Sequence, residues 1–160
     1  MKPAFFLDRD GVLNVDHGYV FRWQDWQWVD GALDAIRLLN RLDYAVVVVT
    51  NQSGVGRGYY SEEDVRSLHR LVARDAADHA AAIDGFYYCP HGPDDLCECR
   101  KPKPGMLLAA ARDLGLDLKR SWLVGDKPTD VEAATAAGVR GALFEGGNLR
   151  DFVAQLLEVS

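Results

Sequence analysis

Two aspartates one residue apart follow a short apolar run near the start of the chain. Asp8 and Asp10 flank Arg9 directly after Ala4–Leu7, and Gly11 comes next. An apolar run that ends in acids predicts a buried strand with its carboxylates at the C-terminal end, where open α/β sheets bind ligands. Alternation along the strand points both aspartates the same way, and such carboxylates repel unless they hold a metal or divide the roles of nucleophile and acid. The alternative is a strand end followed by a polar turn.

Apolar runs alternate with helical patterns along the whole chain. We expect strands at Ala4–Leu7, Ala45–Thr50, Phe86–Tyr88, Trp122–Val124 and Ala142–Phe144, and helices at Gly31–Arg41, Glu62–Ala81, Gly105–Leu114, Asp130–Ala137 and Asp151–Leu157. Ser61 and Asp64 predict a capping box, and Gly138 predicts a helix stop. This order predicts an α/β fold with a Rossmann-like, mostly parallel sheet and helices on both faces. A chain of 160 residues suffices for one domain and not two, so residues 1–160 are expected to form a single domain.

The net charge of the chain argues against some classes of binding partner. A net charge of −6 argues against nonspecific binding to nucleic acid or anionic membranes, which needs a basic surface. The N-terminal apolar run is too short for a secretion signal, and no stretch approaches a membrane span. We therefore expect a cytoplasmic protein with neither nucleic acid nor membrane as partner. We also expect it to act as a monomer.

Polar groups also follow the second expected strand. Thr50 ends a valine-rich run, and Asn51, Gln52 and Ser53 come next. A hydroxyl and backbone donors at this edge of the sheet suit a phosphoryl group. The alternative is an ordinary strand-to-loop transition.

A third acid arrives at the same edge. Asp126 follows the strand that ends at Val124, and Asp130 comes four residues later. Gathered carboxylates suit Mg²⁺, which takes one or two carboxylates and keeps several waters. For Asp130 we favour helix capping or support of the site over direct ligation.

A cysteine-rich loop predicts a second metal. Cys89, His91, Cys97 and Cys99 make a closed tetrahedral zinc set of three thiolates and one imidazole, so the metal would be structural. The alternative is a cluster of buried or free thiols. Arg100 directly follows the last cysteine.

A zinc-bound loop would hold Arg100 and Lys101 rigidly, as a bidentate anion clamp and a point charge respectively. The alternative is that the run Arg100–Gly105 is a solvated basic stretch. Several other residues are less informative. His69 and His79 are expected in solvent on a surface helix. Trp23, Trp26 and Trp28 are expected to pack in the core rather than to form a half-buried strand or a pocket wall.

Together these residues resemble the haloacid dehalogenase superfamily of phosphatases. The four motifs of that family match in order Asp8-x-Asp10-Gly11, Thr50, Lys101 and Gly125-Asp126 with Asp130. Val12 stands where the family often has Thr. The resemblance covers essentially the whole chain and implies the haloacid dehalogenase fold, with no large cap domain and with a zinc-bound loop.

Within the superfamily the chain is most similar to the phosphatases that remove the 7-phosphate of D-glycero-D-manno-heptose 1,7-bisphosphate. The matching stretches are Asn14–Val20, Thr50–Gly54, Cys99–Pro102, Pro104–Met106 and Gly125–Lys127. This similarity implies a Mg²⁺-dependent sugar bisphosphate phosphatase in the synthesis of ADP- or GDP-heptose precursors. The related histidinol-phosphate phosphatases share the zinc set and a short zinc loop like Gly92–Leu96, so histidinol phosphate stays an alternative substrate.

The resemblance also implies a role for each site residue. Asp8 would be the nucleophile that forms an aspartyl-phosphate, and Asp10 the general acid and base. Mg²⁺ would be held by Asp8, the backbone carbonyl of Asp10, and Asp126, while Thr50 and Lys101 hold the phosphoryl group. The implied substrate contacts are Asp16, His17, Gly18, Tyr19, Asn51, Gln52, Ser53, Arg100 and Lys127.

Two rival functions remain open at this point. A phosphotransferase or mutase of the same fold would pass the phosphoryl group to a sugar hydroxyl instead of water. A non-enzymatic zinc-loop binding module would have no use for three aspartates at strand ends.

Overall fold

Five parallel strands form one sheet at the centre of the molecule. The computed structural model describes residues 1–159. The strands are β1 (Ala4–Leu7), β2 (Ala45–Asn51), β3 (Gly85–Cys89), β4 (Trp122–Gly125) and β5 (Arg140–Leu143). Their order across the sheet is β3-β2-β1-β4-β5, and every neighbouring pair is parallel. The predicted parallel α/β sheet is therefore confirmed, with β1 in the middle.

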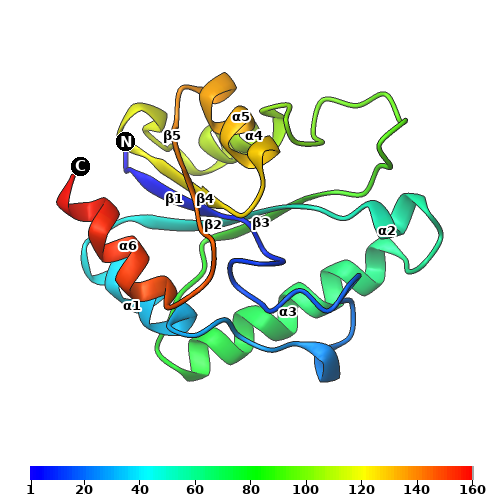
Figure 1. Cartoon of the computed structure of the whole chain (residues 1–160), viewed down its shortest axis with the longest axis horizontal. Helices are drawn as coiled ribbons and strands as arrows, with labels where there is room; N and C mark the ends of the chain where they lie inside the picture. The colour runs from blue at the N-terminus through cyan, green and yellow to red at the C-terminus, as the bar shows by residue number, and fades with distance from the viewer. Residues whose placement is uncertain (160) are drawn as a thin grey trace.

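Helices cover both faces of this sheet. Figure 1 shows α1 (Ala32–Arg41), α3 (Glu62–Asp78) and α6 (Leu149–Glu158) on one side, and α4 (Gly105–Leu114) and α5 (Pro128–Ala137) on the other. The remaining elements are short: α2 (Ser53–Gly56) and the 3₁₀ turns Trp23–Asp25 and Leu118–Arg120. Between β1 and α1 the structure has one short 3₁₀ turn, Trp23–Asp25, and between β3 and α4 it has no helix or strand. These short connections agree with a fold that lacks a large cap domain.

The strands divide their side chains between two cores. Phe5 and Leu7 pack toward α1 and α6, whereas Phe6 packs with Leu107 of α4 and with residues of α5. This alternation follows from the period of two along a strand. All four side chains of β1 are fully buried, so the strand holds Asp8 at a rigid position.

Several helix ends differ from the prediction. The helix α3 stops at Asp78 rather than Ala81, and α5 and α6 begin earlier than expected, at Pro128 and Leu149. The short helix α2 was not predicted, because four residues are too few to show a helical period. The capping box of Ser61 and Asp64 is confirmed, as is Gly138 as a helix stop.

The environment of His69 contradicts the prediction. This side chain is 5% exposed instead of lying in solvent, because it belongs to the face of α3 that packs on the sheet and stacks on Phe86 with ring centroids 4.7 Å apart. His79, at the end of the same helix, is exposed as expected. Trp26 and Trp28 pack against the buried core, which confirms core packing for these two indoles. The prediction is wrong for Trp23, which is 38% exposed.

Within residues 1–159, no helix combines the length and apolar character needed to cross a membrane.

Candidate active site

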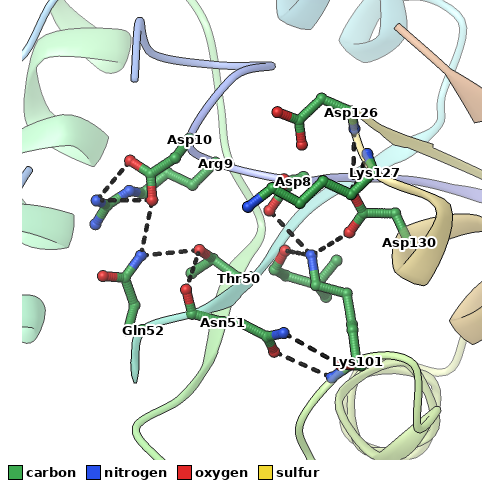
Figure 2. A network of polar contacts seen from close by, with 11 residues as sticks. Asp8, Arg9, Asp10, Thr50, Asn51, Gln52, Lys101, Asp126, Lys127 and Asp130 are labelled. Atoms are coloured by element: carbon green, nitrogen blue, oxygen red, sulfur yellow. Dashed lines mark hydrogen bonds and ion pairs between the residues drawn. The ribbon is translucent and has the colours of Figure 1, made fainter. Parts of the chain in front are cut away.

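The C-terminal ends of three adjacent strands meet at one edge of the sheet. Asp8 follows β1, Thr50 lies near the end of β2, and Asp126 follows β4. Because β1 lies between the other two strands, these side chains come together although they are far apart in sequence (Figure 2). This is the edge at which parallel sheets bind ligands.

Lys101 links two buried carboxylates at this edge. Its Nζ lies 2.9 Å from Oδ1 of Asp8, contacts Oδ1 of Asp130, and donates to the carbonyl of Val49 at 3.1 Å. The lysine and both aspartates are buried. The ammonium is therefore held from three directions.

Burial sets the protonation of these groups. Burial raises the pKa of Asp8 to about 8, although the charge of Lys101 acts in the opposite direction. Burial alone would lower the pKa of Lys101, but Asp8 and Asp130 outweigh it and hold that pKa above its ordinary value. One lysine does not fully compensate two buried carboxylates, so the site favours a further cation.

Asp8, Asp126 and Asp130 form an oxygen cluster that could hold that cation. One carboxylate oxygen from each lies within 4.8 Å of the others. Asp126 Oδ1 is buried and has no hydrogen-bond partner within residues 1–159, which leaves an acceptor free for a metal. Asp130 is already engaged, since its Oδ2 accepts from the backbone N–H groups of Asp126 and Lys127 at 3.1 Å each. The capping and supporting role that the sequence favours for Asp130 agrees with these contacts.

Gly11 is required by the close approach of Asp126. Its φ is +94°, and a Cβ at this position would lie 2.2 Å from Asp126 Oδ2. Only glycine combines this conformation with that contact. The turn at Gly11 therefore packs closely against the carboxylate of Asp126.

Three side chains donate to the carboxylate of Asp10. Oδ1 accepts from Arg9 Nη2 at 2.9 Å and from Asn14 Nδ2 at 2.9 Å, and Oδ2 accepts from Gln52 Nε2 at 3.1 Å. Burial would raise the pKa of Asp10, but the charge of Arg9 and these hydrogen bonds hold it below its ordinary value. The pKa shifts of Asp8 and Asp10 are thus opposite in direction.

The polar residues at the end of β2 and directly after it support the site rather than simply lining it. The side-chain amide of Asn51 accepts from the backbone N–H of Lys101 at 3.0 Å and donates to its carbonyl at 3.3 Å. Gln52 is buried and also donates to Thr50 Oγ1 at 2.9 Å, while its own Oε1 accepts from Tyr60 at 2.5 Å. Asn51 therefore fixes the lysine, and Gln52 connects Thr50 with Asp10.

The expected site residues are distributed over neighbouring hollows. One cavity of about 60 Å³ is lined by the four predicted catalytic residues, Asp8, Asp10, Thr50 and Lys101. The same cavity is also lined by Asn51, Lys127, Thr129 and Asp130. A second cavity of about 210 Å³ shares Asp10, Asn51 and Lys127 with it and adds Asp16, Gly18, Tyr19, Gln52, Ser53 and Tyr60. The two cavities form a small inner chamber with a wider outer one.

Arg100 and His17 lie outside both cavities. The guanidinium of Arg100 faces a separate hollow with Lys103 and donates to the carbonyl of His91 at 3.4 Å. His17 is exposed beside Asp16. Of the cationic residues that we expected to contact the substrate, Lys127 lines both cavities.

The four residues of the cysteine-rich loop converge as expected of metal ligands. Their ligand atoms all lie within 4.8 Å of one another. His91 Nδ1 lies 3.3 Å from the sulfurs of both Cys89 and Cys99, and the sulfurs of Cys89 and Cys97 are 3.8 Å apart. These separations suit a four-coordinate ion with bonds of about 2.0–2.3 Å, whereas the sulfurs of Cys89 and Cys99, 2.6 Å apart, lie closer than two ligands of such an ion. The set is a possible metal site.

This loop packs directly on the start of α4. The N–H of Gly105 donates to the carbonyl of Glu98 at 3.1 Å, and a Cβ at Gly105 would lie 2.2 Å from that oxygen. The thiol cluster and α4 therefore confine the short segment between them, which carries Lys101.

Three residues near the site were not expected to take part in it: Arg9, His69 and Tyr60. Arg9 is fully buried, although it lies between the two aspartates of the first motif. Arginine is almost never fully buried unless it is paired, so its position in a buried strand-to-turn segment was the available signal. Nothing in the local pattern around His69 and Tyr60 indicates their partners, which are Arg9, 60 positions from His69, and Gln52, 8 positions from Tyr60.

Comparisons with known proteins agree with this geometry. The family described as HAD-hydrolase-like matches residues 98–156. A D-glycero-beta-D-manno-heptose-1,7-bisphosphate 7-phosphatase of Yersinia pestis is 49% identical over 144 residues, covering 86% of this chain and 77% of the relative. The protein of the same name in Vibrio cholerae serotype O1 is 50% identical over 145 residues, covering 86% and 78%.

A solved structure resembles the whole chain. It is a crystal structure of D,D-heptose 1,7-bisphosphate phosphatase from B. bronchiseptica complexed with magnesium and phosphate. Its TM-score is 0.86 at 36% sequence identity, and the match covers 100% of both chains.

Proposed function

The chain belongs to the family of D-glycero-D-manno-heptose-1,7-bisphosphate 7-phosphatases, within the haloacid dehalogenase-like hydrolases, and we propose that it hydrolyses the 7-phosphate of such a heptose bisphosphate. The observation that carries this proposal is the buried Asp8–Lys101 pair beside Asp126, at the C-terminal edge of the sheet. We further propose that residues 1–160 act as a single phosphatase domain.

The proposed reaction has two steps, and Asp8 is the nucleophile. A carboxylate oxygen of Asp8 attacks the phosphorus, an O–P bond forms, and the ester bond to the sugar oxygen breaks. Asp10 gives its proton to the leaving alkoxide. Asp10 then takes a proton from a water molecule that attacks the phosphorus of the aspartyl-phosphate, which releases inorganic phosphate and regenerates Asp8.

The residues at this edge fit Mg²⁺. Asp8, Asp126 and the backbone carbonyl of Asp10 would hold it, and the unpartnered Asp126 Oδ1 supports this choice. When bound, the ion neutralises charge as a carboxylate approaches a phosphate dianion. The related protein from B. bronchiseptica was crystallised with magnesium and phosphate, which supports the same cofactor here.

Lys101 and Thr50 are proposed to hold the phosphoryl group in the inner chamber. A charged donor fixed in advance costs no reorganisation when charge develops on the phosphoryl oxygens. Asn51 fixes the lysine, because its side-chain amide forms hydrogen bonds with both the backbone N–H and the backbone carbonyl of Lys101. We therefore assign Asn51 to the lysine more than to the substrate.

The heptose is proposed to occupy the outer chamber. Asp16, Gly18, Tyr19 and Ser53 line it, and Lys127 stands between the two chambers. His17 beside this wall and Arg100 beyond Lys101 would reach the more distant end of the substrate. An arginine suits that second phosphate, since it binds phosphate in a bidentate manner.

Zinc is proposed for the cysteine-rich loop. Three thiolates and one imidazole fill a tetrahedral shell, so the ion would be structural and leave no open position for chemistry. Its expected effect is to hold the loop that carries Arg100 and Lys101.

The test is phosphate release from D-glycero-D-manno-heptose 1,7-bisphosphate with Mg²⁺ present. We expect heptose 1-phosphate and inorganic phosphate in equal amounts, with no activity in Asp8→Asn. Supplying both anomers identifies the preferred one, for which the β form is expected because the relatives are named for it. Absence of phosphate release in buffer, with transfer to an added sugar, would instead indicate a phosphotransferase.

A further inference from the structure

A fully buried arginine joins the first motif to a segment that faces the substrate. The guanidinium of Arg9 donates through Nη2 to both carboxylate oxygens of Asp10, at 2.9 and 3.2 Å, and to the carbonyl of Val20 at 2.6 Å. Val20 directly follows Asp16–Tyr19, three of whose residues line the outer chamber. One planar group therefore touches both the proposed acid–base residue and the end of the proposed sugar-binding segment.

The other end of this guanidinium is fixed by α3. Arg9 Nη1 lies 3.3 Å from Nε2 of His69, and the guanidinium carbon lies 5.8 Å from the centre of the Trp26 ring. Arginine can only donate, so Nε2 of His69 must accept and the proton must be on Nδ1. Burial, followed by the charge of Arg9, lowers the pKa of His69 to about 3, so the imidazole is neutral at ordinary pH.

The surrounding packing leaves these groups little freedom. His69 is stacked on Phe86 of β3, and Val20 packs with Leu68 and Val72 of α3. The imidazole is therefore a rigid acceptor, and the carbonyl of Val20 is held close to it. A group with fixed contacts on several sides can hold a catalytic side chain to within a fraction of an ångström.

We propose that Arg9 is a positioning residue that fixes Asp10 and the segment 16–20 relative to one another, and that His69 fixes Arg9. This inference rests on the proposed function, because it assigns Asp10 and the segment 16–20 to the phosphatase reaction. Arg9 touches neither the phosphorus nor the sugar in this scheme and acts through the carboxylate of Asp10 and the carbonyl of Val20, whereas His69 acts through Arg9.

Steady-state kinetics of four single variants and one control variant test the proposal. Arg9→Met keeps the length of the side chain and removes every donor, and we expect kcat to fall about 10²-fold with a rise in KM. Arg9→Lys should recover part of kcat. His69→Leu should lower kcat on the order of 10-fold, whereas His69→Gln, which keeps an acceptor, should stay near wild type. His79→Gln, exposed at the end of the same helix, is the matched control and should not change either constant.

A double variant separates positioning from general stability. If His69 acts through Arg9, adding His69→Leu to Arg9→Met should lower kcat no further. A loss as large as in the wild-type background would overturn the link between the two residues. Wild-type kcat and KM in Arg9→Met would overturn the proposal as a whole. If Arg9→Met does not fold, the contrast between His69→Leu and His69→Gln decides, and equal activity of these two refutes it.

Limited proteolysis gives a readout that needs no substrate. In Arg9→Met, chymotrypsin should cut faster after Tyr19 and Phe21 than in wild type, because the carbonyl of Val20 has lost its donor. If the wild-type protein releases no phosphate from the heptose bisphosphate, the proposed function fails and cleavage alone decides. Unchanged cleavage would then also overturn the proposal that Arg9 holds the segment 16–20 in place.

Discussion

Lys101 and Asp8 are 93 positions apart in sequence, yet Nζ of the lysine lies 2.9 Å from Oδ1 of the aspartate in a buried pair. The lysine reaches this position from an irregular loop, not from the end of a strand. Asn51 on β2 grips its backbone, and the cysteine-rich loop precedes it directly. The position of Lys101, the proposed phosphoryl-binding cation, therefore depends on contacts outside the four motifs as well as on Asp8 and Asp130.

Removal of the lysine should damage both activity and folding. In Lys101→Met we expect phosphate release to fall by at least 10²-fold, since a fixed charge on the phosphoryl group is lost. Asp8 and Asp130 would remain buried without their shared counter-charge, at a cost of about 3–5 kcal/mol in unfolding free energy. Urea unfolding with and without Mg²⁺ checks this, and the cation should restore part of the loss. Unfolding at the wild-type urea concentration in both conditions would contradict the role of the pair.

The nucleophile and the acid–base residue should respond differently to the same substitution. Asp8→Asn should abolish turnover with the fold intact, because an amide does not attack phosphorus. Asp10→Asn should keep a residual rate, with a loss of about 10²–10⁴-fold in kcat. Phosphate release is the measurement, with circular dichroism as the control for folding. Turnover by Asp8→Asn near the wild-type rate would rule out the covalent mechanism.

The protein should carry about one tightly bound zinc per chain. Elemental analysis of protein purified without added metal checks this. Cys97→Ser should reduce the zinc content and raise KM while Asp8 is untouched, because the loop that holds Arg100 and Lys101 is loosened. A fully active protein without zinc would refute the structural role of the ion.

His69 should make the stability depend on pH. Its pKa is about 3 in the folded protein, lowered from the ordinary value of 6.5. Between these values the unfolded chain binds a proton that the folded protein does not, so stability is complete above about pH 6.5 and falls as the pH drops. From pH 7 to pH 5 this site should cost about 2 kcal/mol.

The comparison of wild type with His69→Gln isolates that contribution. Urea unfolding at pH 7 and pH 5 should show a smaller loss in the variant, since glutamine does not titrate. His79→Gln should behave like wild type, because that histidine is exposed. The same pH dependence in wild type and His69→Gln would show that the buried imidazole takes up its proton without cost.

Substrate choice should follow the number of phosphates. We expect a higher kcat/KM for heptose 1,7-bisphosphate than for histidinol phosphate, because Arg100 and Lys127 exceed what one phosphoryl group needs once Lys101 and Mg²⁺ are counted. Lys103 now contributes less to this argument, since its Nζ contacts the carbonyl of Cys97. Arg100→Ala should reduce the preference. Equal or better turnover of histidinol phosphate would leave the phosphatase assignment standing and remove the heptose.

The sequence predicts those parts of the site that the strands deliver. An apolar run predicts a strand, and a polar residue that follows it is predicted to lie at the C-terminal edge of the sheet. Asp8, Thr50 and Asp126 could therefore be placed close together from the sequence alone. The clustering of three cysteines with His91 was predictable for the same reason, since the spacing is short and the ligand types are specific. Both predictions rest on local patterns: the residues at the end of each strand in the first case, and one short loop in the second.

The contacts of His69, Asn51 and Arg9 could not be predicted in this way. Each depends on a partner from a distant segment: α3 packs its His69 face against the sheet, and Asn51 meets a loop 50 positions away. A helical pattern gives the face that is apolar, but a histidine at its border fits solvent and core equally well. The rotation of α3 against β3 decides between them, and that rotation is a property of the packed molecule.

The short stretch 93–96 lies between the two pairs of ligands and is exposed, with Leu96 98% exposed. Everything that holds Lys101 is attached before or after this stretch. Residues 93–96 are therefore a natural place to graft a peptide tag or a fluorescent label. A label attached there would report on the cysteine-rich loop, and the residues of the proposed active site would keep their positions.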